Sequence, residues 1–235
     1  LLESNMSRKS GWMPTLIERI TLGCKTSPFS GGIQDATVIP LGSEICLSLW
    51  PFIRELPRNI ALVRDSLPEN MDAGKKLFSQ LADDELTYQQ MYVKQCHLAG
   101  ITDEQLKTDI LNEASLNLCQ VMRRWCESPN HKDGVLAVVT AELAATAYAR
   151  QTLEIFERYF ADHAAEYTKE EVEDGLEWLR HHSRPHTRHA LWMKRMLDDI
   201  EVAPGDKLPP PAETVLNALY RLWKCPIETD EKLLE

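Results

Sequence analysis

The sequence predicts an all-α protein, and three observations lead to that prediction. Nearly every patterned segment repeats its apolar residues with the helical period of about 3.6. No block alternates apolar and polar residues as a strand would, and no internal repeat is present. With 235 residues, 43% of them hydrophobic, the chain is long enough to bury a substantial core. We therefore expect one helical bundle of about seven or eight helices.

Each predicted helix is marked by an apolar stripe or by a capping signal. Gly100 is suited to a helix C-terminus, and Thr102 and Thr168 each open a capping box. Pro51 is expected to kink or end the helix that contains it. In chain order, the pattern predicts helices over 44–56, 57–66, 70–99, 102–127, 134–163, 168–182, 183–200 and 213–224.

The N-terminal part of the sequence is less regular than the rest. Residues 1–43 are expected to form an irregular segment packed on the bundle, with 27–42 the least helical part. Residues 44–235 are expected to form the helical domain.

Charge and composition exclude several classes of function. The net charge of −10 argues against nucleic-acid binding and against docking on an anionic membrane. No run of about 18 apolar residues predicts a membrane span, and no secretory signal is expected at the start. The six cysteines contain no Cys-x-x-Cys pair, so we expect reduced thiols in a cytoplasmic protein.

The most specific chemical feature is a stripe of histidines. His182, His186 and His189 are spaced i, i+4 and i+7, which places them within about 60° of one helix face. Neutral imidazole is the commonest metal ligand, so the stripe predicts one metal or part of a two-metal site. Pro185 leaves two geometries open. A kinked helix keeps all three histidines together, whereas a new helix starting at Ser183 keeps only the last two.

Two carboxylates are candidates to complete such a site. Glu142 lies in the middle of a strongly apolar segment, where a carboxylate is costly to bury unless it is paired or binds a metal. Glu85 and Tyr88 are spaced i and i+3, so both side chains can reach one point.

Each candidate also has a structural interpretation. Glu142 could pair with Arg150 or Arg188, and the acidic run 83–85 could be a solvated face. The histidine segment contains several basic residues, so it could be a solvated helix.

The order of these elements resembles the heme-oxygenase-like superfamily, which includes TenA, PqqC and CADD proteins and related di-iron oxidases. The resemblance covers roughly residues 44–224. It rests on an acidic helix that ends in Gly100-Ile101, a helix with the central Glu142, and the stretch 175–182 followed by His189-Ala190.

The di-iron members carry the motif His-x3-Asp-x2-His. His182 and His189 match its histidines, whereas His186 stands where Asp is usual. Glu142 matches the bridging glutamate of the family, and Glu85 carries over from the earlier helix. Tyr88 stands near the position of a family histidine, so the resemblance implies a reduced ligand set.

The resemblance implies an iron-dependent oxidase or oxygenase that acts on a small metabolite in a central cavity. It also implies a homodimer. The expected metal ligands are Glu142, His182 and His189, with His186 and Glu85 as additions, and the expected cavity residues are Tyr88, Tyr92 and Tyr148. No heme is expected, because a heme needs an axial histidine near the first helix and no histidine precedes His97.

Two alternatives stay open. A TenA-like, metal-free hydrolase of a pyrimidine-type metabolite would need a cysteine facing the cavity with a low pKa, Cys126 or Cys119. A non-catalytic member that binds a small ligand would hold no metal, and side chains would fill its cavity.

Overall fold

The computed structural model describes residues 12–29, 33–108, 112–184, 197 and 207–223. Within these ranges the chain forms helices and no strand, as the sequence predicts. The helices are α1 (Trp12–Thr26), α2 (Asp35–Ser66), α3 (Asp72–Leu98), α4 (Asp103–Lys107), α5 (Glu113–Cys126), α6 (His131–Asp162), α7 (Lys169–Gly175), α8 (Glu177–His182) and α10 (Pro210–Leu222).

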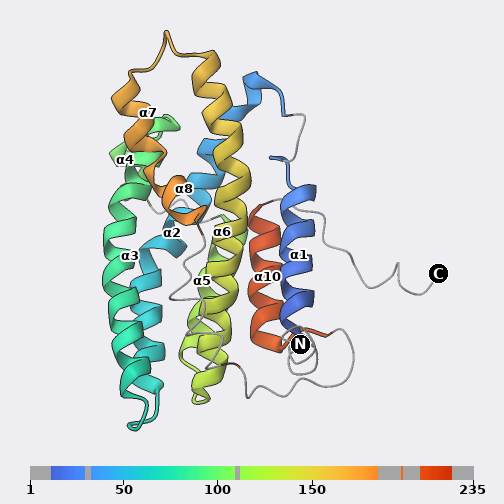
Figure 1. The fold of residues 1–235 in the computed structure, drawn as a ribbon, viewed down its shortest axis with the longest axis vertical. Helices are drawn as coiled ribbons and strands as arrows, with labels where there is room; N and C mark the ends of the chain where they lie inside the picture. The colour runs from blue at the N-terminus through green and yellow to red at the C-terminus, as the bar shows by residue number, and fades with distance from the viewer. Residues whose placement is uncertain (1–11, 30–32, 109–111, 185–196, 198–206, 224–235) are drawn as a thin grey trace, which may run out of the picture.

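The long helices run side by side as an elongated bundle (Figure 1). Helices α2 and α3 pack together on one side, α5 and α6 lie in the middle, and α1 and α10 lie on the other side. The short α7 packs on α3, and α8 lies between α3 and α6. Helix α8 therefore carries its side chains into the middle of the bundle.

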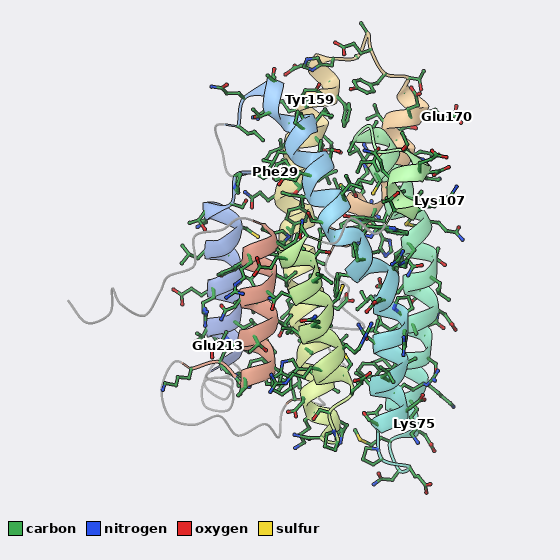
Figure 2. All side chains as sticks on the ribbon, turned by 180° about the vertical axis from the view of Figure 1, so that it is seen from behind. Phe29, Lys75, Lys107, Tyr159, Glu170 and Glu213 are labelled. Carbon is green, nitrogen blue, oxygen red and sulfur yellow. The ribbon has the colours of Figure 1, made fainter. Side chains whose placement is uncertain are left out.

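The N-terminal part is more helical than the sequence predicts. Helix α1 buries Trp12, Leu16 and Ile20 against the bundle, and α2 begins at Asp35, inside the stretch expected to be irregular. The apolar stripe of α2 begins at Val38, so burial against the bundle extends the helix across the predicted boundary at residue 43. Phe29, labelled in Figure 2, follows α1 and packs on α6 side chains.

Three prolines lie inside α2 without ending it. Pro57 has no backbone N–H, so the carbonyl of Ile53 loses its normal helical donor. The Nε2 of Gln89, on α3, donates to that carbonyl at 2.9 Å and to the carbonyl of Arg54 at 3.1 Å. A side chain of α3 thus replaces a backbone hydrogen bond that α2 lacks.

The predicted helix ends around residue 100 are confirmed. Gly100 has a φ of 81°, and the N–H groups of Gly100 and Ile101 bond back to His97 and Cys96 as in a Schellman motif. Thr102 and Thr168 both form the predicted capping boxes, with Gln105 and Glu171 respectively.

The single helix predicted over 102–127 is wrong, because the chain forms two helices there. Asn112 caps the second one: its Oδ1 accepts from the N–H of Ser115 at 2.8 Å. Its Nδ2 donates to the Oγ of Ser48 on α2 at 2.6 Å. The break is therefore stabilised by a contact with another helix.

Helix α6 begins three residues before the expected start at Gly134. A Cβ at Gly134 would lie 2.7 Å from a methyl group of Val63, so this glycine permits close packing of α6 on α2. The last helix, α10, also begins three residues before its expected start and carries a proline in its first turn.

The helix predicted over 183–200 lies largely outside the described residues. Helix α8 ends at His182 with Ser183 as its C-cap, and the buried Leu197 is helical. By length and composition alone, α2 could cross a membrane, but half of its most apolar window is buried inside the bundle. That burial is typical of a core helix.

Candidate functional site

A small cavity lies where α2, α3, α6, α8 and α10 meet. Its volume is about 30 Å³, which is room for about two water molecules. Most of its wall is apolar. The described residues that line it are Leu49, Phe52, Ile53, Leu56, Glu85, Ala141, Glu142, Ala145, Tyr148, Trp178, His182, Leu219 and Trp223.

Two carboxylates face this cavity from different helices. Glu85, on α3, is 3% exposed, and Glu142, on α6, is half-buried and lines the same cavity. Desolvation raises the pKa of Glu142 to about 7. Desolvation, followed by repulsion from Glu142, raises the pKa of Glu85 well above its usual value. Without a cation, the pair therefore retains protons near neutral pH.

His182 faces the same cavity from α8 and is 3% exposed. Its Nδ1 donates to the backbone carbonyl of Trp178 at 2.9 Å, so the neutral ring carries its lone pair on Nε2. The indole of Trp178 stacks on the imidazole with ring centroids 4.0 Å apart. The ring of Tyr88 meets it edge-on at 5.0 Å. Both the tautomer and the orientation of His182 are thus fixed by its neighbours.

Tyr88 joins the two histidines of α8. Its ring centroid lies 4.4 Å from that of His181. Burial and the nearby acidic groups Asp84, Glu85 and Glu142 raise the pKa of Tyr88 to about 12, so the phenol keeps its proton. Sequence reasoning missed His181, although its position next to His182 was the available signal.

The other predicted cavity tyrosines lie in different surroundings. Tyr148 lines the cavity and stacks on Trp223 with centroids 5.1 Å apart. Tyr92 is 1% exposed, packs edge-on against Trp178 and donates from its hydroxyl to the carbonyl of Cys46. Tyr92 and Tyr88 are not among the described cavity-lining residues, because their rings pack against neighbouring aromatic side chains.

The structural alternatives for the two carboxylates can now be compared with the geometry. Asp83 is exposed, Asp84 accepts a hydrogen bond from Gln80, and only Glu85 of this acidic run is buried. Arg150 donates to the carbonyl of Ser183 at 3.1 Å and, within the described ranges, forms no ion pair with Glu142. Arg188 lies outside the described residues.

Solved structures with a similar architecture identify the fold. A TenA homologue from Pseudomonas syringae pv. tomato strain DC3000 superposes with a TM-score of 0.67 at 13% identity, covering 93% of this chain and 90% of that one. A domain with a heme oxygenase-like fold from Shewanella denitrificans OS217 gives 0.65 at 15% identity, with 90% and 87% covered. The chain has the heme-oxygenase-like fold. A TenA homologue from P. horikoshii OT3 gives 0.62 at 15% identity, with 89% and 93% covered.

The sequence itself gives no closer relationship. No protein-family model matches it, and no curated protein matches it. At these identities, the similarity establishes the heme-oxygenase-like fold, and the chemistry has to be argued from the site.

The side chains that face the cavity include oxygen and nitrogen atoms of the kinds that bind iron. The structure brings Glu85, Glu142 and His182 to one cavity of the heme-oxygenase-like bundle, and these are oxygen and nitrogen donors that suit iron. Across the described ranges, no three or more His, Cys, Asp or Glu side chains form a group that could hold a metal ion. The other predicted ligands, His186 and His189, lie outside the described residues.

The cysteines predicted for a metal-free hydrolase lie elsewhere. Cys119 and Cys126 are not among the described residues that line the cavity. Burial raises the pKa of Cys119 to about 11 and that of Cys126 to about 12, so neither thiol is activated.

Proposed function

We propose that this heme-oxygenase-like chain is an iron-dependent oxidase or oxygenase that acts on a small metabolite at the central cavity. The observation that carries the proposal is the pair Glu85 and Glu142, two desolvated carboxyls facing one cavity together with an oriented imidazole. Two ionised carboxylates at this depth cost on the order of several kcal/mol unless a cation or protons compensate them.

The orientation of His182 supports the same proposal. Histidines that bind metals commonly donate their second ring N–H to a backbone carbonyl, which fixes the tautomer. His182 makes that bond to Trp178, and stacking holds its ring in place.

The residues have separate roles in this proposal. Glu85, Glu142 and His182 would each supply a ligand to the iron, and His189 and His186 are proposed to complete the ligand set, because the described side chains do not form a group of three that holds a metal. Iron, when bound, would supply oxygen binding and electron transfer. Tyr148 and the apolar wall of α2 would border the iron and exclude water from it.

The remaining expectations also stay proposals. We infer a homodimer in the cytoplasm that binds a small-molecule substrate and uses neither heme, nucleic acid nor a membrane. The net charge of −10 supports the last two exclusions.

One observation favours a second candidate, a metal-free hydrolase of the TenA type. A carboxyl whose pKa is about 7, as for Glu142, can donate and accept protons at neutral pH. The two similar structures described as TenA homologues share the fold on which this candidate rests. The cysteine nucleophile that it requires has no counterpart among the described cavity residues.

Metal content tests the proposal. The protein would be purified without a histidine tag or chelator, loaded anaerobically with ferrous iron, desalted and analysed by plasma mass spectrometry. We expect about one to two irons per chain. The double variant Glu85→Gln/Glu142→Gln should lose most of the iron, whereas Glu170→Gln, which removes an exposed carboxylate, should retain it.

Two outcomes would contradict the proposal. Wild-type protein without iron after loading would favour the metal-free candidates. Full iron occupancy in the double variant would show that the iron binds elsewhere. If iron binds as expected, an oxygen-consumption screen with small acids and amines would then address the substrate.

A further inference from the structure

Two buried thiols meet at the interface between α2 and α3. Cys46, on α2, is 2% exposed and Cys96, on α3, is fully buried. Each thiol shifts the pKa of the other, so the two side chains lie next to each other. All five described cysteines are free thiols, and these two interact directly across the most extensive helix contact of the bundle.

Polar groups of α3 hold Cys46 in this position. The Nε2 of Gln95 donates to the Sγ of Cys46 at 3.6 Å, and the hydroxyl of Tyr92 donates to its carbonyl at 3.1 Å. Gln95 is the chain neighbour of Cys96, so the same turn of α3 supplies a donor and a second thiol. Two hydrogen bonds therefore fix Cys46 against the turn of α3 that carries Cys96.

The pair differs from the other buried cysteines in its electrostatics. Hydrogen bonds from Cys96, Tyr92 and Gln95 together outweigh burial and lower the pKa of Cys46, while the pKa of Cys96 is raised. Cys119 and Cys126 have raised pKa values because of burial. A thiol that ionises more easily beside one that stays protonated is the arrangement of an attacking and a resolving cysteine.

We propose that Cys46 and Cys96 are an oxidisable dithiol that closes to a disulfide between α2 and α3 when it reacts with hydrogen peroxide. The Cys46 thiolate attacks one peroxide oxygen, which forms a sulfenic acid and, after protonation, one water. The Cys96 sulfur then attacks the sulfenic sulfur and a second water leaves. Two thiols lose two electrons and two protons, and one peroxide is reduced to two waters.

The oxidant can approach from the cavity. Leu49, which lines the cavity, follows Cys46 by three residues on α2, so the two side chains lie on the same side of that helix. Peroxide has two heavy atoms, and the cavity has room for about two waters. The reaction needs no metal, so the inference stands independently of the proposed function.

The disulfide would tie together two walls of the site. Helix α2 contributes Leu49, Phe52, Ile53 and Leu56 to the cavity, and α3 contributes Glu85. A link between residues 46 and 96 would close a long loop and fix these walls against each other. Oxidation should therefore raise the unfolding temperature by on the order of 5 to 10 °C, reversibly with dithiothreitol.

Peptide mapping of the wild-type chain tests the proposal directly. After peroxide treatment and blocking of free thiols under denaturing conditions, trypsin yields peptides 26–54 and 95–107, each with a single cysteine. We expect a cross-linked pair of these peptides, lighter by two hydrogens than their sum, that grows with time. Dithiothreitol should abolish it.

Single substitutions provide the controls. Cys96→Ser should abolish the cross-link and leave Cys46 as a sulfenic acid that dimedone traps, whereas Cys119→Ser should leave the cross-link unchanged. Recovery of Cys46 and Cys96 as thiols, or a link from Cys46 to another cysteine, would overturn the proposal. The wild-type map decides the matter even where a variant does not fold.

Discussion

His182 and His163 make the same local contacts in two different places. In each, Nδ1 donates to the carbonyl four residues earlier, at 2.9 and 2.8 Å. Each ring also stacks on the aromatic side chain at that earlier position, Trp178 for His182 and Tyr159 for His163, with centroids 4.0 and 4.2 Å apart. The local geometry therefore does not distinguish the two histidines.

Their surroundings do distinguish them. His182 is buried and shares a cavity with Glu85 and Glu142. His163 is half-buried and caps the C-terminus of α6, and Tyr159 lies toward that end of the bundle (Figure 2). A metal site in a helical bundle needs ligands from several helices. His182 therefore belongs to a candidate site because α3 and α6 place carboxylates at the same cavity, and not because of its own local contacts.

The largest expected difference between the two histidines is in metal affinity. His182→Ala should weaken ferrous iron binding by about 100-fold or more, because loss of an outer partner alone costs 10 to 100-fold. His163→Ala should leave the affinity unchanged. Titration calorimetry under anaerobic conditions measures both, with circular dichroism to check helix content. If both substitutions weakened iron binding equally, His182 could not be distinguished from His163 as a metal ligand.

The second test concerns Glu142, a carboxylate at the cavity that His182 faces. The pKa of Glu142 lies above the unfolded value, so its contribution to stability is full below about pH 4.5 and is lost as pH rises to about 7. Glu142→Gln lacks this loss and should stabilise the metal-free protein at pH 8 by up to about 3 kcal/mol, with little change at pH 4.5. Denaturant unfolding at both pH values measures this difference.

The control for that test is the exposed Glu170, whose change to Gln should have little effect at either pH. With iron bound, the wild type should be more stable than Glu142→Gln, because iron stabilises the protein that binds it and the Gln variant binds it less well. If Glu142→Gln changed stability equally at pH 4.5 and pH 8, the raised pKa of Glu142 would be contradicted.

A third change acts at the junction between α7 and α8, which positions His182. A Cβ at Gly175 would lie 2.5 Å from the Cβ of Leu98, so Gly175→Ala should push the end of α7 away from α3. We expect a loss of about 1 to 3 kcal/mol in unfolding free energy, together with weaker iron binding. Unchanged iron affinity despite lower stability would show that His182 holds its position independently of this contact.

The smallest expected effect concerns α2, which forms one wall of the cavity that His182 faces. Gln89→Leu removes the donor to the carbonyl that Pro57 exposes and should cost about 1 kcal/mol. Gln90→Leu, at the exposed neighbouring position, should change stability much less. Hydrogen exchange within 50–57 should quicken in the first variant alone.

The sequence by itself determined what depends on a few neighbouring residues. The helical period, the capping boxes at Thr102 and Thr168, and the helix end at Gly100 follow from contacts within about four residues along the chain. The isolated carboxylate Glu142 was conspicuous for the same reason, since its apolar segment is visible in the sequence.

Only the tertiary structure decided what depends on contacts between helices. It extended α2 back to Asp35 and began α5 after Asn112, which bonds to Ser48 on α2. It also buried Glu85 while leaving Asp83 exposed. It also brought Cys46 to Cys96. The period of a helix fixes how its side chains are spaced around one axis. Which side chains are buried, and opposite what, depends on helices distant in the sequence.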